Sequence, residues 1–393
     1  MRALLFCNEM LGLGHLRLSL ALASEIVRRD RASTALVATG SPAFAGIPVP
    51  DRVDLLKLPT LPVGSHSRWS DTTMRPPTGL TIPEEQIVAM RARLSLAAAQ
   101  ELRPDIAIVD YRPVGRGGDL RDTLEWLRTQ GGCTNALGLW DVDDDPARLG
   151  QDWTEELAST VAELYDLALF YGPPDPDDLR LTRLRAAGVP VHATALVAEP
   201  PSASPPSDLG DGYLLVTTGG GIDGGELLYC VLRSIALRPP GVAAVLVTGP
   251  MMPAAEVRRL RAAADELDAL VVESRPDMAD VLAGARAVIA MAGYNTVAEV
   301  IASGAPTLLV PRTFPRREQL NRARRWAEQG RIRMLDPDEL DPARLADEIE
   351  ELLRQPRASR QEATGAQDAI DILEAARGRT MLPTSVELAQ DSR

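Results

Sequence analysis

A nine-residue stretch, Met291-Ala-Gly-Tyr-Asn-Thr-Val-Ala-Glu299, combines residue types that suit the binding of a diphosphate. It joins the apolar run 286–290 to a helical pattern that ends at Gly304. A strand followed by a small-residue turn and a new helix presents unpaired backbone N–H groups at the positive end of a helix dipole. We therefore expect this turn to bind a diphosphate. The contacting residues would be Gly293, Tyr294, Asn295 and Thr296.

Glu299 lies one helical turn beyond Asn295, on the same face of the predicted helix. From there its carboxylate can accept hydrogen bonds from ribose hydroxyls. The spacing Thr296-Val-Ala-Glu299 is also that of a capping box, in which Glu299 would bond back to the backbone of Thr296. Spacing alone favours neither interpretation.

Three arginines and a glutamine follow the next apolar run, 306–310. Arg312, Arg316 and Arg317 can balance the charge of a leaving group, although solvated loop arginines are common. Glu318 comes next, and the Gln319 that follows it can offer its amide to sugar hydroxyls. Alternatively, Gln319 is an ordinary glutamine on the surface of a helix. One ligand would use all of these groups, a sugar carried on a nucleoside diphosphate.

Two glycine-rich turns each follow a strand candidate at the start of one half of the chain. In the first, Gly12-Leu-Gly14-His15, the histidine would begin a helix and take a proton from an acceptor hydroxyl or amine. The alternative is a glycine turn with an incidental histidine. In the second turn, Thr218 precedes Gly219, Gly220 and Gly221, where backbone can approach a diphosphate closely.

An acidic run, Asp141-Val-Asp-Asp-Asp145, follows a strand candidate in the first half. Clustered carboxylates can hold Mg²⁺ or Mn²⁺. However, Asp145-Pro146 also fits a helix N-cap, and the run lies in the half opposite the nucleotide turn, so we expect no metal. We expect instead an acidic pocket for a cationic or polyhydroxylated acceptor, with Asp141 as its inward member and as an alternative base to His15. The candidate acceptor-binding residues are His66, Arg68, Asp110 and Asp143.

Composition narrows the classes of protein. At 393 residues the chain is expected to form two domains, and a formal net charge of −13 argues against nucleic acid as the main partner. The three cysteines lack paired or metal-ligand spacing, which favours a reduced cytoplasmic protein. No run reaches the roughly 18 apolar residues that a membrane helix requires, so we expect a soluble protein. The only lysine is Lys57, which argues against a pyridoxal-dependent phosphorylase.

Short apolar runs alternate with helical patterns throughout, which predicts two doubly wound α/β domains facing each other across a cleft. The predicted strands are 3–7, 35–38, 53–58, 106–109, 135–140 and 167–171, then 213–217, 243–248, 270–273, 287–290 and 307–310. We assign 1–198 to an N-terminal acceptor domain, 199–212 to a Pro- and Ser-rich linker, 213–376 to a C-terminal donor domain and 377–393 to a polar tail. Residues 59–83 would form a long loop over the cleft.

Together these motifs resemble the GT-B glycosyltransferases, specifically the family 28 group that includes the MurG-like N-acetylglucosaminyltransferases. The resemblance rests on the two glycine turns, on Gly293-Tyr-Asn-Thr-Val-Ala-Glu299 and on Arg317-Glu-Gln319. It implies a C-terminal donor domain, in which Glu299 contacts the ribose and Gln319 contacts the donor sugar. The backbone from Arg275 to Met278 would face the nucleobase. It also implies inversion without a metal or other cofactor, and UDP-sugar as the default donor.

MurG-like enzymes dock on membranes through an apolar patch with basic residues, and no such segment occurs here. A small soluble acceptor, as in natural-product biosynthesis, is therefore the expectation. Two other functions share this architecture. One is a nucleotide-sugar 2-epimerase, which would act on the donor alone. The other is a non-catalytic nucleotide-sugar-binding protein.

Overall fold

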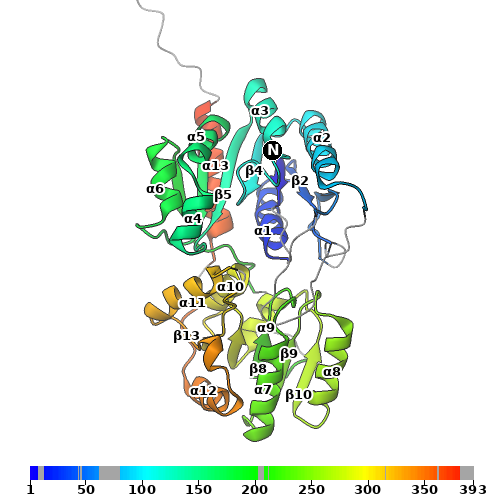
Figure 1. Cartoon of the computed structure of the whole chain (residues 1–393), viewed down its shortest axis with the longest axis vertical. Helices are drawn as coiled ribbons and strands as arrows, with labels where there is room; N and C mark the ends of the chain where they lie inside the picture. The colour runs from blue at the N-terminus through cyan, green and yellow to red at the C-terminus, as the bar shows by residue number, and fades with distance from the viewer. Residues whose placement is uncertain are drawn as a thin grey trace, which may run out of the picture.

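The computed structural model describes residues 1–7, 13–42, 44, 47–61, 80–201, 208–210, 212–314, 316–360 and 363–380. Two parallel sheets, each covered by helices, stand one above the other (Figure 1). The predicted pair of doubly wound domains is thereby confirmed.

The N-terminal sheet has seven strands in the order β3-β2-β1-β4-β5-β6-β7. Its strands are β1 (Arg2–Phe6), β2 (Thr34–Thr39), β3 (Val53–Lys57), β4 (Ile106–Asp110), β5 (Thr134–Trp140), β6 (Leu167–Tyr171) and β7 (Val191–Thr194). Its helices are α1 (Gly14–Arg29), α2 (Glu84–Leu102), α3 (Arg121–Gln130), α4 (Pro146–Asp152), α5 (Glu155–Leu164) and α6 (Leu179–Ala186). Every residue of β4 and β6 is buried, as expected for central strands with helices on both faces.

The C-terminal sheet has six strands in the order β10-β9-β8-β11-β12-β13. Its strands are β8 (Leu214–Thr217), β9 (Ala244–Val247), β10 (Ala269–Val272), β11 (Ala287–Ala290), β12 (Thr307–Leu309) and β13 (Arg333–Met334). Its helical segments are α7 (Gly225–Leu237), α8 (Ala254–Ala264), α9 (Met278–Gly284), α10 (Tyr294–Ser303), α11 (Glu318–Glu328), η2 (Pro337–Glu339) and α12 (Pro342–Arg354).

The last helix, α13 (Gly365–Thr380), returns to the N-terminal half (Figure 1). Arg29 of α1 forms an ion pair with Asp371, and the backbone N–H of Ala195 donates to Asp368 at 2.9 Å. The sequence-based division places residues 365–376 in the donor domain and starts the tail at 377. In the structure this helix packs on the other domain and continues to Thr380, so the chain crosses between the halves twice.

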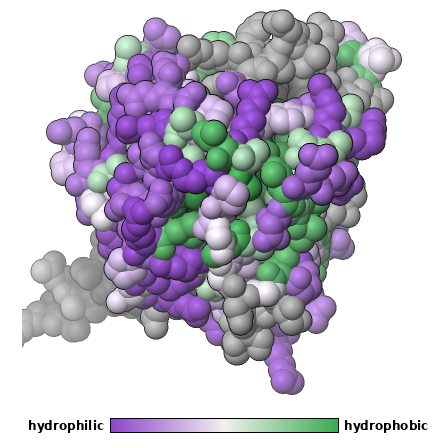
Figure 2. Space-filling model, turned by 90° about the horizontal axis from the view of Figure 1, so that it is seen from below, coloured by the Kyte–Doolittle hydropathy of each residue, from purple (hydrophilic) through white to green (hydrophobic). Residues whose placement is uncertain are grey.

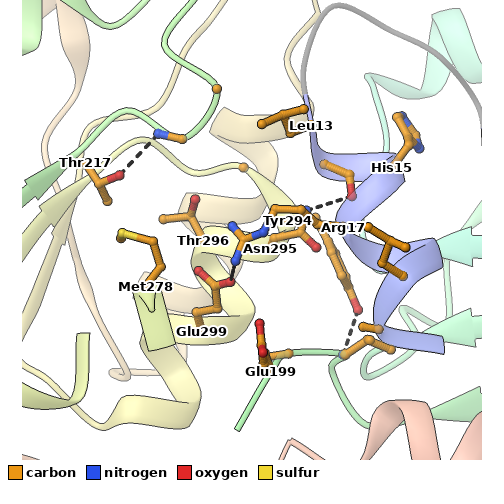
Figure 3. A pocket seen from close by; sticks show the side chains of 18 of the residues that line it. Leu13, His15, Arg17, Glu199, Thr217, Met278, Tyr294, Asn295, Thr296 and Glu299 are labelled. Atoms are coloured by element: carbon orange, nitrogen blue, oxygen red, sulfur yellow. Dashed lines mark hydrogen bonds and ion pairs between the residues drawn. The ribbon is translucent and has the colours of Figure 1, made fainter. Parts of the chain in front are cut away.

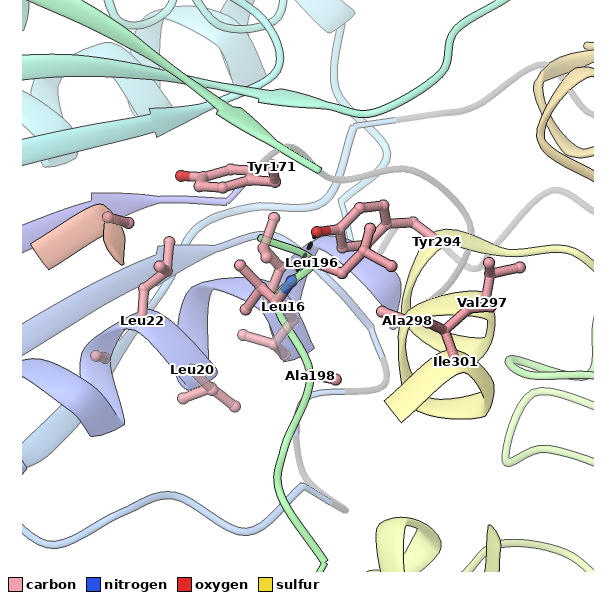
Figure 4. Packing of buried hydrophobic residues seen from close by; sticks show 14 of the residues in the cluster. Leu16, Leu20, Leu22, Tyr171, Leu196, Ala198, Tyr294, Val297, Ala298 and Ile301 are labelled. Carbon is pink, nitrogen blue, oxygen red and sulfur yellow. Dashed lines mark hydrogen bonds between the residues drawn. The ribbon is translucent and has the colours of Figure 1, made fainter. Parts of the chain in front are cut away.

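One of the buried hydrophobic clusters contains residues of both halves. Figure 4 shows Leu16 and Leu20 of α1, Leu196 of the crossing segment, and Tyr294 and Val297 of α10 packed together. The backbone N–H of Val197 donates to the Tyr294 hydroxyl at 3.0 Å. The first crossing is therefore fixed to α10 by packing and by a buried hydrogen bond.

Seen from the end of the C-terminal half (Figure 2), the surface is mostly hydrophilic around a central band of hydrophobic residues. Within the described residues, none of the helices has the length and apolar character needed to span a bilayer.

Candidate functional site

A cavity of about 1940 Å³ lies between the two halves and is lined by both. Strand order reverses between β1 and β4 in the first sheet and between β8 and β11 in the second. Ligands of doubly wound sheets bind at such switch points, outside the carboxyl ends of the strands. His15 follows β1 and Asp110 ends β4, while Gly219 follows β8 and Gly293 follows β11. The two switch points thus carry the predicted catalytic residue His15 and two of the predicted donor-binding turns.

On the N-terminal side, His15 is held by two neighbours. Its Nδ1 lies 2.5 Å from Oδ2 of Asp110, and its ring stacks on Trp140 at a centroid distance of 4.1 Å. The indole N–H of Trp140 donates to the other carboxylate oxygen of Asp110 at 3.1 Å. His15 lines the cavity, whereas Asp110 is buried behind it. The predicted acceptor ligand Asp110 is therefore placed as the partner that orients the imidazole.

Tyr111 comes directly after Asp110 and has a positive φ of 68°, which is unfavourable for a bulky residue. Its hydroxyl donates to Asp143 at 2.9 Å, and burial raises the pKa of Tyr111, with Asp143 adding to the shift. The predicted acceptor ligand Asp143 thus faces Tyr111 and the buried Arg180. Sequence reasoning missed Trp140 and Tyr111. An aromatic at a strand end was the one available signal.

On the C-terminal side, two glycine turns pack back to back. Gly221 has a φ of +87°, and a Cβ there would lie 2.3 Å from the carbonyl oxygen of Thr248. The Thr218 hydroxyl donates to this same carbonyl at 2.7 Å. Gly219, with a φ of +69°, faces more open space near Thr296. The turn 218–221 therefore presents backbone to the cavity, with all four residues among its lining.

Helix α10 begins at the cavity with Gly293 as its N-cap, and no side chain caps its first turn. Its free N–H groups face the same space as the turn 218–221. Asn295 reaches across the cavity, and its amide donates to the carbonyl of Gly14 at 2.9 Å. Figure 3 shows Asn295 and Thr296 between Met278 on the C-terminal side and His15 on α1.

The buried carboxylate of Glu299 forms an ion pair with the half-buried Arg17 of α1 (Figure 3). Burial raises the pKa of Glu299, and the Arg17 guanidinium opposes the shift. The capping-box interpretation is wrong, because the helix starts at Tyr294 and Thr296 lies inside its first turn. Glu299 instead lines the cavity.

Three other predicted donor residues gather at the start of α11. Oε1 of Gln319 accepts from the backbone N–H groups of Ala292 and Arg312, each at 3.2 Å. These bonds fix the side chain, and among the described residues its amide nitrogen has no hydrogen-bond partner. The Arg312 guanidinium pairs with Glu318, and it lies 3.4 Å from Asp223. Burial raises the pKa of Asp223, and Arg312 opposes this effect.

Arg275 and Met278 line the far end of the cavity. The Arg275 guanidinium is engaged by Asp208 at 2.5 Å and by Asp277 at 2.6 Å. Hydrogen bonds to these two carboxylates raise the pKa of Arg275. Its side chain is held at the surface of the pocket, and the neighbouring backbone remains exposed to a ligand.

The acidic run does not form an acceptor pocket, and this prediction is wrong. Asp141 is 1% exposed and pairs with the equally buried Arg322 at 2.9 Å. Asp144 accepts from the backbone of Arg317 at 3.0 Å, while Asp145 binds the Arg317 guanidinium at 3.1 Å. These carboxylates dock the N-terminal half onto α11.

The roles predicted for Asp141 as a base and for Arg317 at the leaving group are therefore wrong. Asp141 does not line the cavity, so it is not placed to act as a base. Arg317 does not line it either, so it is not placed at a leaving group. Arg316 does line it, while pairing with Asp152 at 3.1 Å. Gly12, His66 and Arg68 lie outside the described residues.

Comparisons with known proteins agree with this architecture. The model of the glycosyltransferase family 28 C-terminal domain matches residues 215–375. The chain is 32% identical over 173 residues to the UDP-N-acetylglucosamine--N-acetylmuramyl-(pentapeptide) pyrophosphoryl-undecaprenol N-acetylglucosamine transferase of Ralstonia nicotianae. That match covers 42% of this chain and 47% of the relative, so the chain spans about half the length of the curated relatives it matches.

Solved structures resemble almost the whole chain. The calicheamicin glycosyltransferase CalG4 aligns with a TM-score of 0.58 at 20% identity, covering 97% of this chain and 100% of its own. Acinetobacter baumannii MurG aligns with a TM-score of 0.58 at 13% identity, covering 95% and 100%. The UDP-GlcNAc 2-epimerase of Methanocaldococcus jannaschii aligns with a TM-score of 0.57 at 10% identity, covering 95% and 100%. These likenesses establish the two-domain GT-B fold.

Proposed function

We propose that the protein is an inverting glycosyltransferase, because residues 215–375 match the glycosyltransferase family 28 C-terminal domain and the chain has a GT-B fold. Its donor would be a nucleoside-diphosphate sugar, UDP-sugar by default. One observation carries the proposal. The His15–Asp110 pair and the uncapped N-terminus of α10 face each other across a single cavity.

The donor would lie along the C-terminal switch point. Its diphosphate would accept hydrogen bonds from the 218–221 turn and from the first turn of α10, where the helix dipole favours negative charge. Glu299 would accept from the ribose, and the free amide nitrogen of Gln319 would donate to the sugar. The nucleobase of the donor would pack beside Met278. Arg312 lines the cavity near these groups and would balance part of the leaving-group charge.

Acceptor activation would fall to His15. Its Nδ1–H donates to Asp110, which assigns the tautomer and leaves Nε2 as the proton acceptor. The acceptor oxygen or nitrogen would lose its proton to Nε2 and attack the anomeric carbon. The bond from that carbon to the diphosphate breaks on the opposite face, so configuration inverts. Asp110 would stabilise the imidazolium, and no metal or other cofactor enters the scheme.

The lipid-linked acceptor named for the Ralstonia nicotianae relative is not proposed for this chain. The family match is confined to residues 215–375, and the acceptor would bind the other half. We propose a small polar acceptor in the cytoplasm.

Direct assays of donor use test the proposal. Purified protein is titrated by calorimetry with UDP, dTDP, GDP and ADP and then incubated with the corresponding sugars. We expect one nucleoside diphosphate to bind tightly and its sugar to be transferred with inversion. Formation of an epimer from donor alone would indicate the 2-epimerase, whose fold is shared. Donor binding without turnover toward any acceptor would indicate a binding protein. Absence of nucleotide binding would refute the proposal.

A further inference from the structure

We propose that the acceptor carries an anionic group, a phosphate or a carboxylate, and that Arg112 binds it beside the His15–Asp110 pair. This inference rests on the proposed function, because it identifies the molecule that His15 would deprotonate. It starts from the charges that the N-terminal half contributes to the cavity. They are five arginines and one glutamate, in a chain whose net charge is −13. These residues are Arg17, Glu25, Arg28, Arg112, Arg116 and Arg148.

Three of the five arginines already have carboxylate partners. Arg17 pairs with Glu299, Arg28 pairs with Glu25, and Arg148 lies 3.4 Å from Asp144. Arg116 also has an interaction of its own. Within the described residues, the Arg112 guanidinium has no hydrogen bond or ion pair, and its Nε is buried without a partner. The Arg112 side chain is half-buried, and an N–H that is buried without an acceptor is costly, so a missing acceptor is expected at this Nε.

The position of Arg112 relates it to the reacting atoms. It lies two residues after Asp110, in the turn where its backbone N–H donates to the Asp110 carbonyl at 2.8 Å. Within the described residues the Asp110 carboxylate, which accepts from His15 and Trp140, makes no hydrogen bond to the Arg112 side chain. Arg112 lines the main cavity and also a small one of about 20 Å³ behind it. Its side chain therefore borders the acceptor end of the cleft, on the half opposite the turn 218–221.

The chemistry of the guanidinium indicates the class of ligand. Its planar fork of N–H donors matches the oxygens of a carboxylate or phosphate, and bidentate pairs of this kind are among the stronger hydrogen bonds in proteins. An anion held here would place a hydroxyl or amine of the same molecule near His15. A cationic acceptor, expected from the acidic run, is disfavoured. Asp141 and Asp145 of that run are bound to arginines of the C-terminal half.

The first experiment measures anion binding itself. Inorganic phosphate is titrated into the full-length protein by calorimetry, with and without saturating UDP. We expect wild-type protein to bind phosphate in both conditions, and Arg112→Gln to bind it about tenfold or more weakly when UDP fills the donor site. Arg112→Lys should retain part of the affinity, because it keeps the charge and loses the fork. Arg148→Gln, an exposed cavity arginine of the same half, is the matched control and should bind as wild type.

The outcomes separate this inference from the proposed function. Unchanged phosphate binding by Arg112→Gln overturns the inference. Loss of the Arg112-dependent binding when UDP is added also overturns it, because the arginine then belongs to the donor diphosphate. If UDP fails to bind but phosphate binding still depends on Arg112, the proposed function fails and the anion site remains.

A second experiment identifies the source of the anion. Glycerol 3-phosphate is titrated under the same conditions, and flotation is measured with phosphatidylcholine vesicles that contain or lack phosphatidic acid. Arg112-dependent binding of glycerol 3-phosphate alone indicates a free acceptor. Arg112-dependent flotation only with phosphatidic acid indicates a phosphate carried on a lipid. Binding of neither overturns the assignment to an acceptor.

Discussion

Arg17 of α1 and Glu299 of α10 form an ion pair that joins the two halves of the molecule across the cavity. The Glu299 side chain is 5% exposed and the Arg17 side chain 33% exposed. The residue proposed to bind the ribose is therefore held by the opposite half. When a donor binds, Glu299 must either release Arg17 and accept from the ribose hydroxyls, or accept from the hydroxyls while it keeps Arg17.

Removing Arg17 alone should destabilise the protein more than removing both partners. Arg17→Gln leaves the buried Glu299 carboxylate without its counter-charge, and we expect a loss of about 1–2 kcal/mol in the free energy of unfolding, a value reduced for the partial exposure of Arg17. Arg17→Gln/Glu299→Gln should recover most of it. Urea unfolding of the four proteins in the double-mutant cycle measures the coupling. A double variant as unstable as the single one would contradict a direct interaction.

The same pair predicts a pH dependence of stability. Burial raises the pKa of Glu299 above its ordinary value of 4.5, so the folded state binds this proton more tightly than the unfolded state. The free energy of unfolding should then fall as pH rises from about 4.5 through the raised value. The fall should be steeper in Arg17→Gln and absent in Glu299→Gln. Urea unfolding across this range tests the sign, and a Glu299→Gln profile like that of wild type would refute the assignment.

The His15–Asp110 pair makes a prediction about turnover. His15→Ala removes the proposed base and should lower kcat by about 10²–10⁴-fold while donor affinity stays near normal. Asp110→Asn should lower kcat by a smaller factor, because the imidazole loses its orienting carboxylate. His192→Gln, on β7 of the same sheet, is the control histidine and should retain activity. Steady-state transfer assays and UDP calorimetry on all three variants distinguish catalysis from binding.

Most of the fold followed from hydrophobic pattern. All eleven predicted strands occur, with bounds that differ by no more than one residue at either end. The two missed strands have physical reasons. In β7, three of four residues are not buried, so no apolar run marks it. Strand β13 has only two residues. The destination of α13 was also missed, since helical pattern specifies a buried face and not which sheet it covers.

The site was predictable where it depends on local chain geometry. Glycine turns after strands and the Gly293–Glu299 segment line the cavity because strand-to-helix turns always meet at one edge of a parallel sheet. Partner choice was not predictable. Asp141 and Arg322 are 181 positions apart, and nothing in either neighbourhood indicates that they pair. The acidic run was therefore interpreted as a pocket although arginines of the other half neutralise it.

Gly221 tests whether the turn must be backbone alone. Gly221→Ala places a Cβ 2.3 Å from the Thr248 carbonyl oxygen at a φ of +87°. The turn must shift, and we expect UDP affinity to fall about tenfold or more. Gly118→Ala is a matched control, because its φ is +83° with nothing within 4 Å. That variant carries the conformational cost alone, about 1–2 kcal/mol, and should keep its UDP affinity. Equal UDP affinity in the two variants would show that the turn does not contact the donor.

The buried Asp141–Arg322 pair should contribute strongly to the attachment of the two halves. The Arg322 guanidinium binds the Asp141 carboxylate and also donates to the carbonyls of Ala292 and Val142, each at 3.1 Å. Arg322→Met leaves a carboxylate buried without its counter-charge, and a loss of about 3–5 kcal/mol in the free energy of unfolding is expected. Arg324→Met, an exposed arginine of the same helix, is the control and should change it by less than about 0.5 kcal/mol.

Replacing both partners distinguishes an ion pair from simple packing. Asp141→Leu/Arg322→Met removes both charges, and we expect it to be more stable than Arg322→Met alone, because no unpaired carboxylate stays in the interface. Urea unfolding gives the comparison, and intrinsic tryptophan fluorescence is a suitable probe because Trp140 and Trp326 lie on the two elements that the pair joins. If the double variant were less stable than Arg322→Met, the carboxylate of Asp141 would be held by groups other than Arg322, and the pair would not be what fixes α11 to β5.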